Sequence, residues 1–232
     1  FRYISSQGMA YNTDYVEEEP TEWDDIKTED LEDFLTFHDY GPSRFGIAAA
    51  SIDAEINDLS SDDDDAEALF DELSAEVHDQ HQYVRNYWGS GDQFMQMYRS
   101  EAVGAGSAWG GRIRRMNLNG HDQMEFTHTD QGGIAWSEVY CIPRDSEKKD
   151  DAYELLNWLY DRENIIELTE INGYPLPLSG DEPDFVSELP DYAEHPEDLV
   201  WIDWVNLPEG DIDWLTRMSE RFAEIKGGQW EP

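Results

Sequence analysis

The residues best suited to chemistry lie in one segment, which runs from Gln131 to Pro143. Two glycines follow Gln131 and a proline closes the segment, a pattern typical of a strand entered through a tight turn. Because side chains alternate between the two faces of a strand, Trp136, Glu138 and Tyr140 share one face. An aromatic plane beside a carboxylate suits an organic cation, which is attracted by the ring face and by the charge. The spacing alone also fits a simpler interpretation, an amphipathic strand with a surface glutamate and a half-buried tryptophan.

Metal ligands are the next candidates, and neither cluster in the sequence has a complete set. The four aspartates at 62–65 lack the glycine and glutamate of a calcium loop, and acids at that place suit the start of a helix. His78 and His81 have a spacing that could hold zinc, but no third ligand follows them at a telling distance. We therefore predict no metal site and no cofactor.

Signatures of catalysis are also missing from the sequence. There is no G-x-S-x-G elbow, no H-E-x-x-H motif, and no signature of a nucleophile around Cys141, the single cysteine. Acid pairs occur throughout the chain, so no one pair identifies a glycosidase. The loop at 89–92 could hold an anion at a helix N-terminus, but it lacks the Lys-Ser/Thr ending of a nucleotide loop. We predict no catalytic residues, and a secreted acidic hydrolase stays open as an alternative.

An alternation of strands and helices must position these residues. The sequence predicts strands at 3–12, 35–38, 84–88, 104–111 and 131–143, and helices after Ser43, Asp65 and Asp92, from Lys149, at 163–171 and at 212–226. This alternation is typical of an α/β fold, and we expect mostly parallel pairing. Trp109 ends a strand of small residues, at a place where open α/β sheets hold ligands.

Negative charge dominates the composition. The 232 residues include 54 Asp and Glu against 15 Lys and Arg, a formal net charge of -39. At molar salt the Debye length falls to about 3 Å, which screens this repulsion, so we infer a salt-adapted protein from a halophile. Nucleic acid is excluded as a partner, because its phosphates require basic patches. No apolar run is long enough to span a membrane, so we expect membrane contact only through an anchor or a permease outside this chain.

The order of motifs along the chain resembles that of the spermidine/putrescine-binding proteins of ABC importers. Those proteins show a G-G-x-x-W-x-D/E strand, an I-P pair, a leucine-rich helix and an I-G-Y-P-x-P ending. This chain has the corresponding residues at 132–138, at 142–143, in the helix up to Tyr160 and at 171–177. Further landmarks are residues 8–12, Trp23 with Asp24, and residues 101–109.

The resemblance implies a type II periplasmic-binding-protein-like fold, an α/β fold in which crossing strands join two lobes. Residues 1–12 would be a crossing strand and remnant of lobe 1, 13–130 lobe 2, 131–176 part of lobe 1, and 177–232 the return to lobe 2 with the C-terminal helix. Crossings would lie at 10–12, at 131–136 and after Tyr174. The first lobe would be incomplete, so we expect a truncated importer subunit that lacks its N-terminal part.

The resemblance also implies roles for individual residues. Trp109 and Trp136 match the aromatic residues that sandwich the methylenes of the amine, and Glu138 matches an aspartate that pairs with an ammonium group. Ser90 falls near a polar contact to the ligand.

One part of the family pattern is not matched. Where the family places two carboxylates for the far amine, this chain has Tyr40 and Ser43, with only Asp39 close by and Arg44 adjacent. The polar contact of the last segment aligns loosely near Asn206. The departure makes a single-headed cation, or another small organic solute, fit as well as a diamine.

These features together predict the solute-binding subunit of an ABC importer, with a polyamine or other organic cation as ligand. Its partners would be that small molecule and the permease. It would lie outside the cytoplasmic membrane, lipid-anchored in its full-length form. The alternatives are a binding protein for a sugar, an amino acid or an anion, the acidic hydrolase, and a structural protein of the cell surface.

Overall fold

A computed structural model of the chain describes residues 3–60, 64–174, 199–203, 207 and 213–232. The crossing expected after Tyr174, most of the expected return to the second lobe and the match near Asn206 lie outside these residues.

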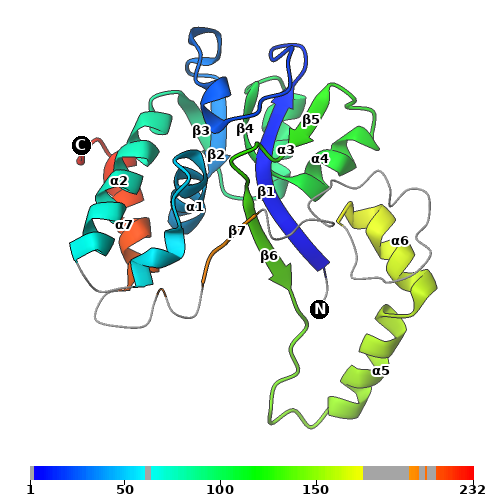
Figure 1. Cartoon of the computed structure of the whole chain (residues 1–232). Coiled ribbons are helices and arrows are strands. Elements are labelled where there is room, and N and C mark those ends of the chain that lie inside the picture. The colour runs from blue at the N-terminus through cyan, green and yellow to red at the C-terminus, as the bar shows by residue number, and fades with distance from the viewer. Residues whose placement is uncertain (1–2, 61–63, 175–198, 204–206, 208–212) are drawn as a thin grey trace.

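The described strands form one sheet, with the order β3-β2-β4-β1-β6-β7 and with β5 paired to β1. The strands are β1 Tyr3–Asn12, β2 Leu35–His38, β3 Val84–Trp88, β4 Ala105–Trp109, β5 Met124–Thr127, β6 Ile134–Glu138 and β7 Val200–Trp201. The ten-residue β1 organises the sheet (Figure 1). It pairs with β4 along one edge, and along the other with β6 through its first half and β5 through its second half.

The expectation of mostly parallel pairing is wrong. β2 runs parallel to β3 and β4, and β6 runs parallel to β7, but β1 is antiparallel to β4, β5 and β6. The strand–helix alternation specifies parallel units only where a helix connects two neighbouring strands. It carries no information about the direction of a long strand such as β1, which meets three strands that follow it much later in the chain.

Helices cover both faces of the sheet. They are α1 Gly41–Ser51, α2 Asp64–His81, α3 Gly91–Arg99, α4 Gly110–Asn117, α5 Lys149–Leu159, α6 Arg162–Asn172 and α7 Trp214–Lys226, with short 3-10 helices at Trp23–Ile26, Glu29–Leu31 and Ile56–Ser60. In Figure 1, α1, α2 and α7 lie on one side of β1, and α3 and α4 lie on the other.

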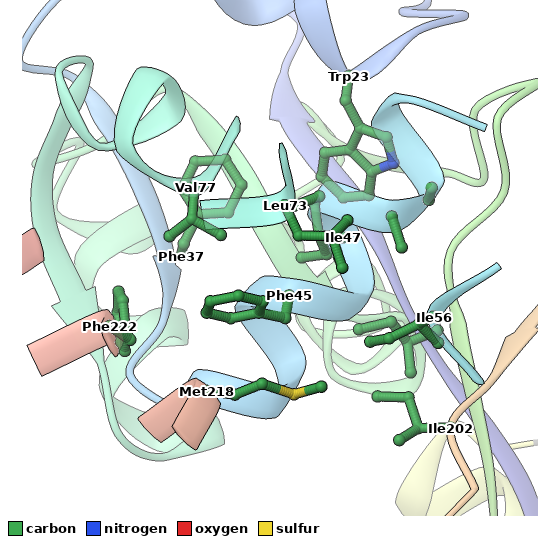
Figure 2. Packing of buried hydrophobic residues seen from close by; sticks show 14 of the residues in the cluster. Trp23, Phe37, Phe45, Ile47, Ile56, Leu73, Val77, Ile202, Met218 and Phe222 are labelled. Carbon is green, nitrogen blue, oxygen red and sulfur yellow. The ribbon is translucent and has the colours of Figure 1, made fainter. Parts of the chain in front are cut away.

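Alternate residues of β1 pack into the two cores that these helices complete. Met9 and Tyr11 belong to the core under α1, α2 and α7, whereas Ala10 belongs to the core under α3 and α4. Figure 2 shows the larger core, where α1, α2 and α7 contribute Phe45, Ile47, Leu73, Val77, Met218 and Phe222. Burying a side chain such as Phe45 in full contributes about 1.5–3 kcal/mol, and many such contacts fix α1 above the sheet.

Several predicted strands match the structure closely, and others differ. The strands at 3–12, 35–38 and 84–88 are confirmed. The strand expected to reach Pro143 ends at Glu138, because its pairing with β1 ends at the pair Tyr3 and Glu138. The polar segment after Trp109 contains α4 and β5, which the sequence reading did not expect, since two glycines at the start of α4 resemble a turn.

α5 stands apart from the rest of the molecule. It has no buried residue, and Tyr153, Leu155 and Trp158 are more than half exposed. Figure 1 shows it beyond the edge of the sheet, next to α6. Among the described helices, none combines the length and the apolar character that crossing a membrane requires.

Candidate ligand-binding site

A cavity of about 280 Å³ lies where β2 and β4 end and α1 and α4 begin. Crevices at the carboxyl ends of strands are the usual ligand sites of open α/β sheets. The lining residues are Gln7, His38, Tyr40, Ser43, Trp109, Arg112, Ile134, Trp136, Glu138, Tyr174 and Ile202.

The register of the sheet places one group of these residues on a single face. Gln7 of β1 lies opposite Trp109 of β4 and opposite Ile134 of β6. Residues that lie directly opposite each other project from the same face, and Trp136 and Glu138 follow Ile134 in steps of two. One sheet face therefore carries the amide, both indoles and the carboxylate.

The two tryptophans meet edge to face. Their ring centroids are 6.2 Å apart and the rings are inclined by 66°. Trp109 also contacts the buried Trp88 edge-on, with centroids 5.0 Å apart. Such contacts hold the Trp109 ring in place while both cavity indoles stay half-buried, so they can receive an apolar or cationic group.

The start of α1 supplies Tyr40 and Ser43. Pro42 lies in the first turn, where its missing N–H costs nothing, and Tyr40 is the N-cap residue. The Ser43 hydroxyl donates a hydrogen bond of 2.9 Å to Gln7 Oε1. This bond ties the first turn of α1 to β1 across the cavity wall.

Tyr174 lines the cavity together with a cation, Arg112, and an anion, Glu138. Burial raises the pKa of the Tyr174 phenol, the neighbouring Arg112 guanidinium opposes that shift and hydrogen-bonds to the phenol, and the Glu138 carboxylate adds to the rise. Arg112 also contacts the Asp92 carboxylate at 3.5 Å. The cavity therefore holds charges of both signs within reach of one phenol.

Two glycines allow Tyr174 to reach this position. A Cβ at Gly111 would lie 2.5 Å from the Tyr174 ring, so the ring rests directly on the first turn of α4. Gly173 has a φ of 77°, as predicted for the left-handed residue that ends α6, and a Cβ there would overlap the Gly111 carbonyl.

His38 is a neutral aromatic residue at the base of the cavity. Its ring stacks on Trp88 with centroids 4.2 Å apart and an inclination of 13°. Burial lowers the pKa of His38 to about 4, with Asp39 opposing the shift and Arg44 adding to it. Near pH 7 the imidazole therefore adds no charge to the site.

The cavity brings together most of the residues that the resemblance singled out. Trp109, Trp136, Glu138, Tyr40 and Ser43 line it. Tyr140, which was expected on the same strand face, lies beyond the end of β6 and packs edge-on against Tyr160.

Asp39 and Ser90 do not line the cavity. Asp39 forms an ion pair with Lys226 of α7. The Ser90 hydroxyl accepts a hydrogen bond of 3.2 Å from the backbone N–H of Gln93 and so caps α3. Both side chains already have structural partners, which directs them away from the cavity.

Sequence reasoning missed Gln7, His38, Arg112 and Tyr174 as lining residues. For Gln7 a signal existed, because it shares a strand face with the buried Met9 two residues on. Arg112 lies close in sequence to Arg114 and Arg115, and only the helix phase of α4 separates its side chain from theirs.

The described residues contain no group of three or more His, Cys, Asp or Glu side chains that could hold a metal ion. His81 Nδ1 lies 2.8 Å from the Tyr87 hydroxyl, and the His78 ring packs edge-on against Trp230. Both histidines thus have structural contacts of their own.

Comparison with known proteins gives a consistent result. A family model described as bacterial extracellular solute-binding protein matches residues 1–197. The chain is similar to the spermidine/putrescine-binding periplasmic protein of Salmonella typhimurium, with 24% identity over 73% of this chain and 46% of that protein. It is also similar to the putrescine-binding periplasmic protein PotF of Escherichia coli K12, with 28% identity over 67% of this chain and 44% of that protein. The chain spans less than half the length of these curated relatives.

A solved structure shows the same fold. The spermidine/putrescine ABC transporter substrate-binding protein PotD from Streptococcus pneumoniae superposes with a TM-score of 0.76 at 20% identity, covering 99% of this chain and 68% of that one. The predicted α/β, periplasmic-binding-protein-like fold is thereby confirmed.

Proposed function

The chain belongs to the bacterial extracellular solute-binding proteins, and we propose that it captures a small organic solute for an ABC importer. The observation that carries this proposal is the cavity between β4, β6 and the start of α1, where two indoles, a carboxylate and a guanidinium converge. Binding of this kind needs complementary shape and charge but no reacting group. The solute would therefore be released unaltered.

The proposed ligand has a cationic end that lies against Trp109 and Trp136 near Glu138. An aromatic face and a carboxylate both favour a cation, and they do so most strongly where water is excluded. The relatives in Salmonella typhimurium and Escherichia coli are named as spermidine/putrescine-binding and putrescine-binding proteins. Tyr40 and Ser43 would contact the rest of the solute, whereas Ser90 and Asp39 would act indirectly, through α3 and α7.

We also propose the division into two lobes that the resemblance implies, with 1–12 as a crossing strand and remnant of lobe 1, 13–130 as lobe 2, 131–176 as part of lobe 1, and 177–232 as the return to lobe 2 with the C-terminal helix. The isolation of α5 supports this division, since a helix with an exposed apolar face suits a lobe of its own. Solute would then bind where the lobes meet, and closure of the lobes would exclude water.

The place of action would be outside the cytoplasmic membrane. The relatives are named periplasmic proteins, and the family is described as extracellular. We propose a lipid anchor in the full-length form and an ABC permease as the partner that receives the solute.

Ligand screening by thermal shift tests the binding function. The protein would be melted in 2 M KCl with polyamines, betaines, amino acids and sugars, because a solute that binds only the folded state raises the melting temperature. A ligand present at 100 times its Kd stabilises the fold by about 2.7 kcal/mol. If no solute of any class shifts the midpoint, the binding function is wrong.

Paired variants test whether this cavity is the site. Trp136→Ala removes a cation–π contact worth about 2 kcal/mol when desolvated, so we expect binding to weaken about 30-fold. Trp158→Ala removes an exposed indole on α5 and serves as the control. Glu138→Gln and the exposed Glu154→Gln form a second pair. Calorimetry measures the affinity of each variant for the solute. If each cavity variant binds the solute as tightly as its control, the site lies elsewhere.

A further inference from the structure

We propose that the solute is a zwitterion, which carries a carboxylate as well as a cationic end, and that Arg112 and Gln7 hold the carboxylate. This inference rests on the proposed function, because it specifies the class of solute for the same cavity. Its basis is the set of hydrogen-bond donors and charges in the cavity wall. A diamine could not accept hydrogen bonds from those donors.

Gln7 has a buried hydrogen-bond donor without a partner. It is 2% exposed and lines the cavity from the centre of the sheet. Its Oε1 accepts the hydrogen bond from Ser43, while its Nε2 has no partner. Buried amide donors are normally satisfied, so this one calls for an acceptor. An ammonium group offers only donors and cannot supply one, whereas a carboxylate can.

Arg112 is the cation of the cavity wall. It lines the cavity from the first turn of α4, and its Nε has no partner. Besides its hydrogen bond to the Tyr174 phenol, Arg112 forms an ion pair with Asp92 at 3.5 Å, which is weak because the Asp92 side chain is 84% exposed. A guanidinium matches a carboxylate in shape and charge, and it repels an ammonium group.

The surrounding charges point the same way. Arg44 is fully buried beneath the start of α1, where it bonds to the neutral Gln80, and two of its nitrogens have no partner. Asp39, the acid closest to the position where the family pattern has carboxylates, pairs with Lys226. A second ammonium group would therefore meet positive charge without a lining carboxylate of its own.

The charge balance of the wall is that of a zwitterion. Among the described residues that line the cavity, Glu138 is the single carboxylate and Arg112 the single fixed cation. A solute with one charge of each sign is complementary to this pair, with its cationic end on the indoles. An ω-amino acid or a betaine has this chemistry.

Two matched pairs of probes separate the classes. 4-Aminobutyrate and putrescine share a four-carbon chain, and glycine betaine and choline share a trimethylammonium head. We expect one zwitterion to bind at least about tenfold more tightly than its partner, a difference of about 1.4 kcal/mol, by calorimetry in 2 M KCl. Tighter binding of both pure cations would overturn the inference.

The remaining outcomes are also decisive. If none of the four probes binds but a sugar or another solute does, the zwitterion is wrong and the binding function stands. If no small solute binds at all, both the inference and the binding function fail.

Two substitutions test where the carboxylate of the solute binds. Arg112→Gln should weaken the zwitterion at least about tenfold, whereas the exposed Arg115→Gln on the same helix should not. Gln7→Glu keeps the acceptor for Ser43 and replaces the free donor with an acceptor, so the preference should move toward the cation of each pair. Circular dichroism confirms that each variant folds, and Gln7→Glu tests the inference even if Arg112→Gln does not fold. Unchanged preference in a folded Gln7→Glu protein would refute it.

Discussion

Burial determines which side chains around the cavity carry charge. His38 and Arg44 are close neighbours in the structure, and burial disfavours the charged form of both. The histidine responds by staying neutral, with a pKa of about 4. The arginine keeps its charge because its pKa, lowered to about 10, still lies far above neutral pH. Near pH 7, therefore, Arg44 carries a positive charge and His38 does not.

Because His38 is neutral in the folded state, we predict that folding stability depends on pH. Its folded-state pKa of about 4 lies below the ordinary value of 6.5, so the unfolded chain binds the proton first. Stability from this group is complete above pH 6.5 and is lost as the pH falls from 6.5 toward 4. At pH 5 the loss is about 2 kcal/mol.

Denaturant unfolding of wild type and His38→Phe in high salt measures this loss. Phenylalanine preserves the stack on Trp88 and cannot titrate, so the stability difference between the two proteins should shift by about 2 kcal/mol in favour of the variant between pH 7.5 and pH 5. A difference that does not vary with pH would show that His38 is not the titrating group.

At the scale of elements, β1 is decisive because three later strands pair with it. It brings β4 and β6 to its two edges, and so brings Trp109 and Trp136 within 6.2 Å although 26 residues separate them in the chain. β4 is held on its other edge by β2, at a point where Gly106 has a φ of 142°. The site therefore depends on close backbone contact between β4 and its neighbours.

Gly106→Ala should disrupt that contact. A Cβ at Gly106 would overlap the Thr36 carbonyl oxygen, so we expect a loss of about 3 kcal/mol or more in unfolding free energy, along with the cavity. Gly120 also has a positive φ, but a Cβ there meets nothing within 4 Å, so Gly120→Ala should cost only about 1 kcal/mol. Similar losses for both variants in urea titrations would mean that backbone conformation, rather than the overlap, sets the cost.

At the scale of the whole molecule, the most unusual property is the large net negative charge. The net charge of -39 is spread over 232 residues, and several of the few bases pair with acids of other elements. Arg217 of α7 pairs with Glu67 of α2 at 2.6 Å, and Lys27 contacts Asp24 and Asp79. The Arg217 pair is partly exposed, and pairs of that kind contribute at most about 1 kcal/mol each, so they offset only part of the repulsion among the acids.

Salt should therefore stabilise the fold. Raising KCl from 0.1 M to 2 M shortens the Debye length from about 10 Å to less than about 3 Å, which screens the repulsion between surface acids. We expect the melting temperature to rise by about 10 °C or more, since 1 kcal/mol corresponds to roughly 2–4 °C in a domain of this size. An osmolyte such as sucrose at equal osmolarity is the control. A melting temperature independent of KCl would contradict salt adaptation.

Local pattern predicted much of this protein. The extended segment at 3–12, the side-chain alternation at 134–138 and the turns that follow 35–38 and 84–88 were enough to place β1, β2, β3 and the core of β6. The start of α4 was not predictable in this way, because Gly111, which lets Tyr174 approach, and Gly110 before it remove the local signal for a helix.

The sequence by itself determined which residues share a strand face, and so it singled out Trp136 with Glu138 and placed Trp109 at a strand end. Only the tertiary structure decided that Gln7, Arg112 and Tyr174 join them, and that Asp39 and Ser90 are occupied elsewhere. The physical reason is that side-chain periodicity is a property of one element, whereas a binding cavity depends on the direction and register with which β1 pairs its neighbours. Those are settled by the packing of the whole chain.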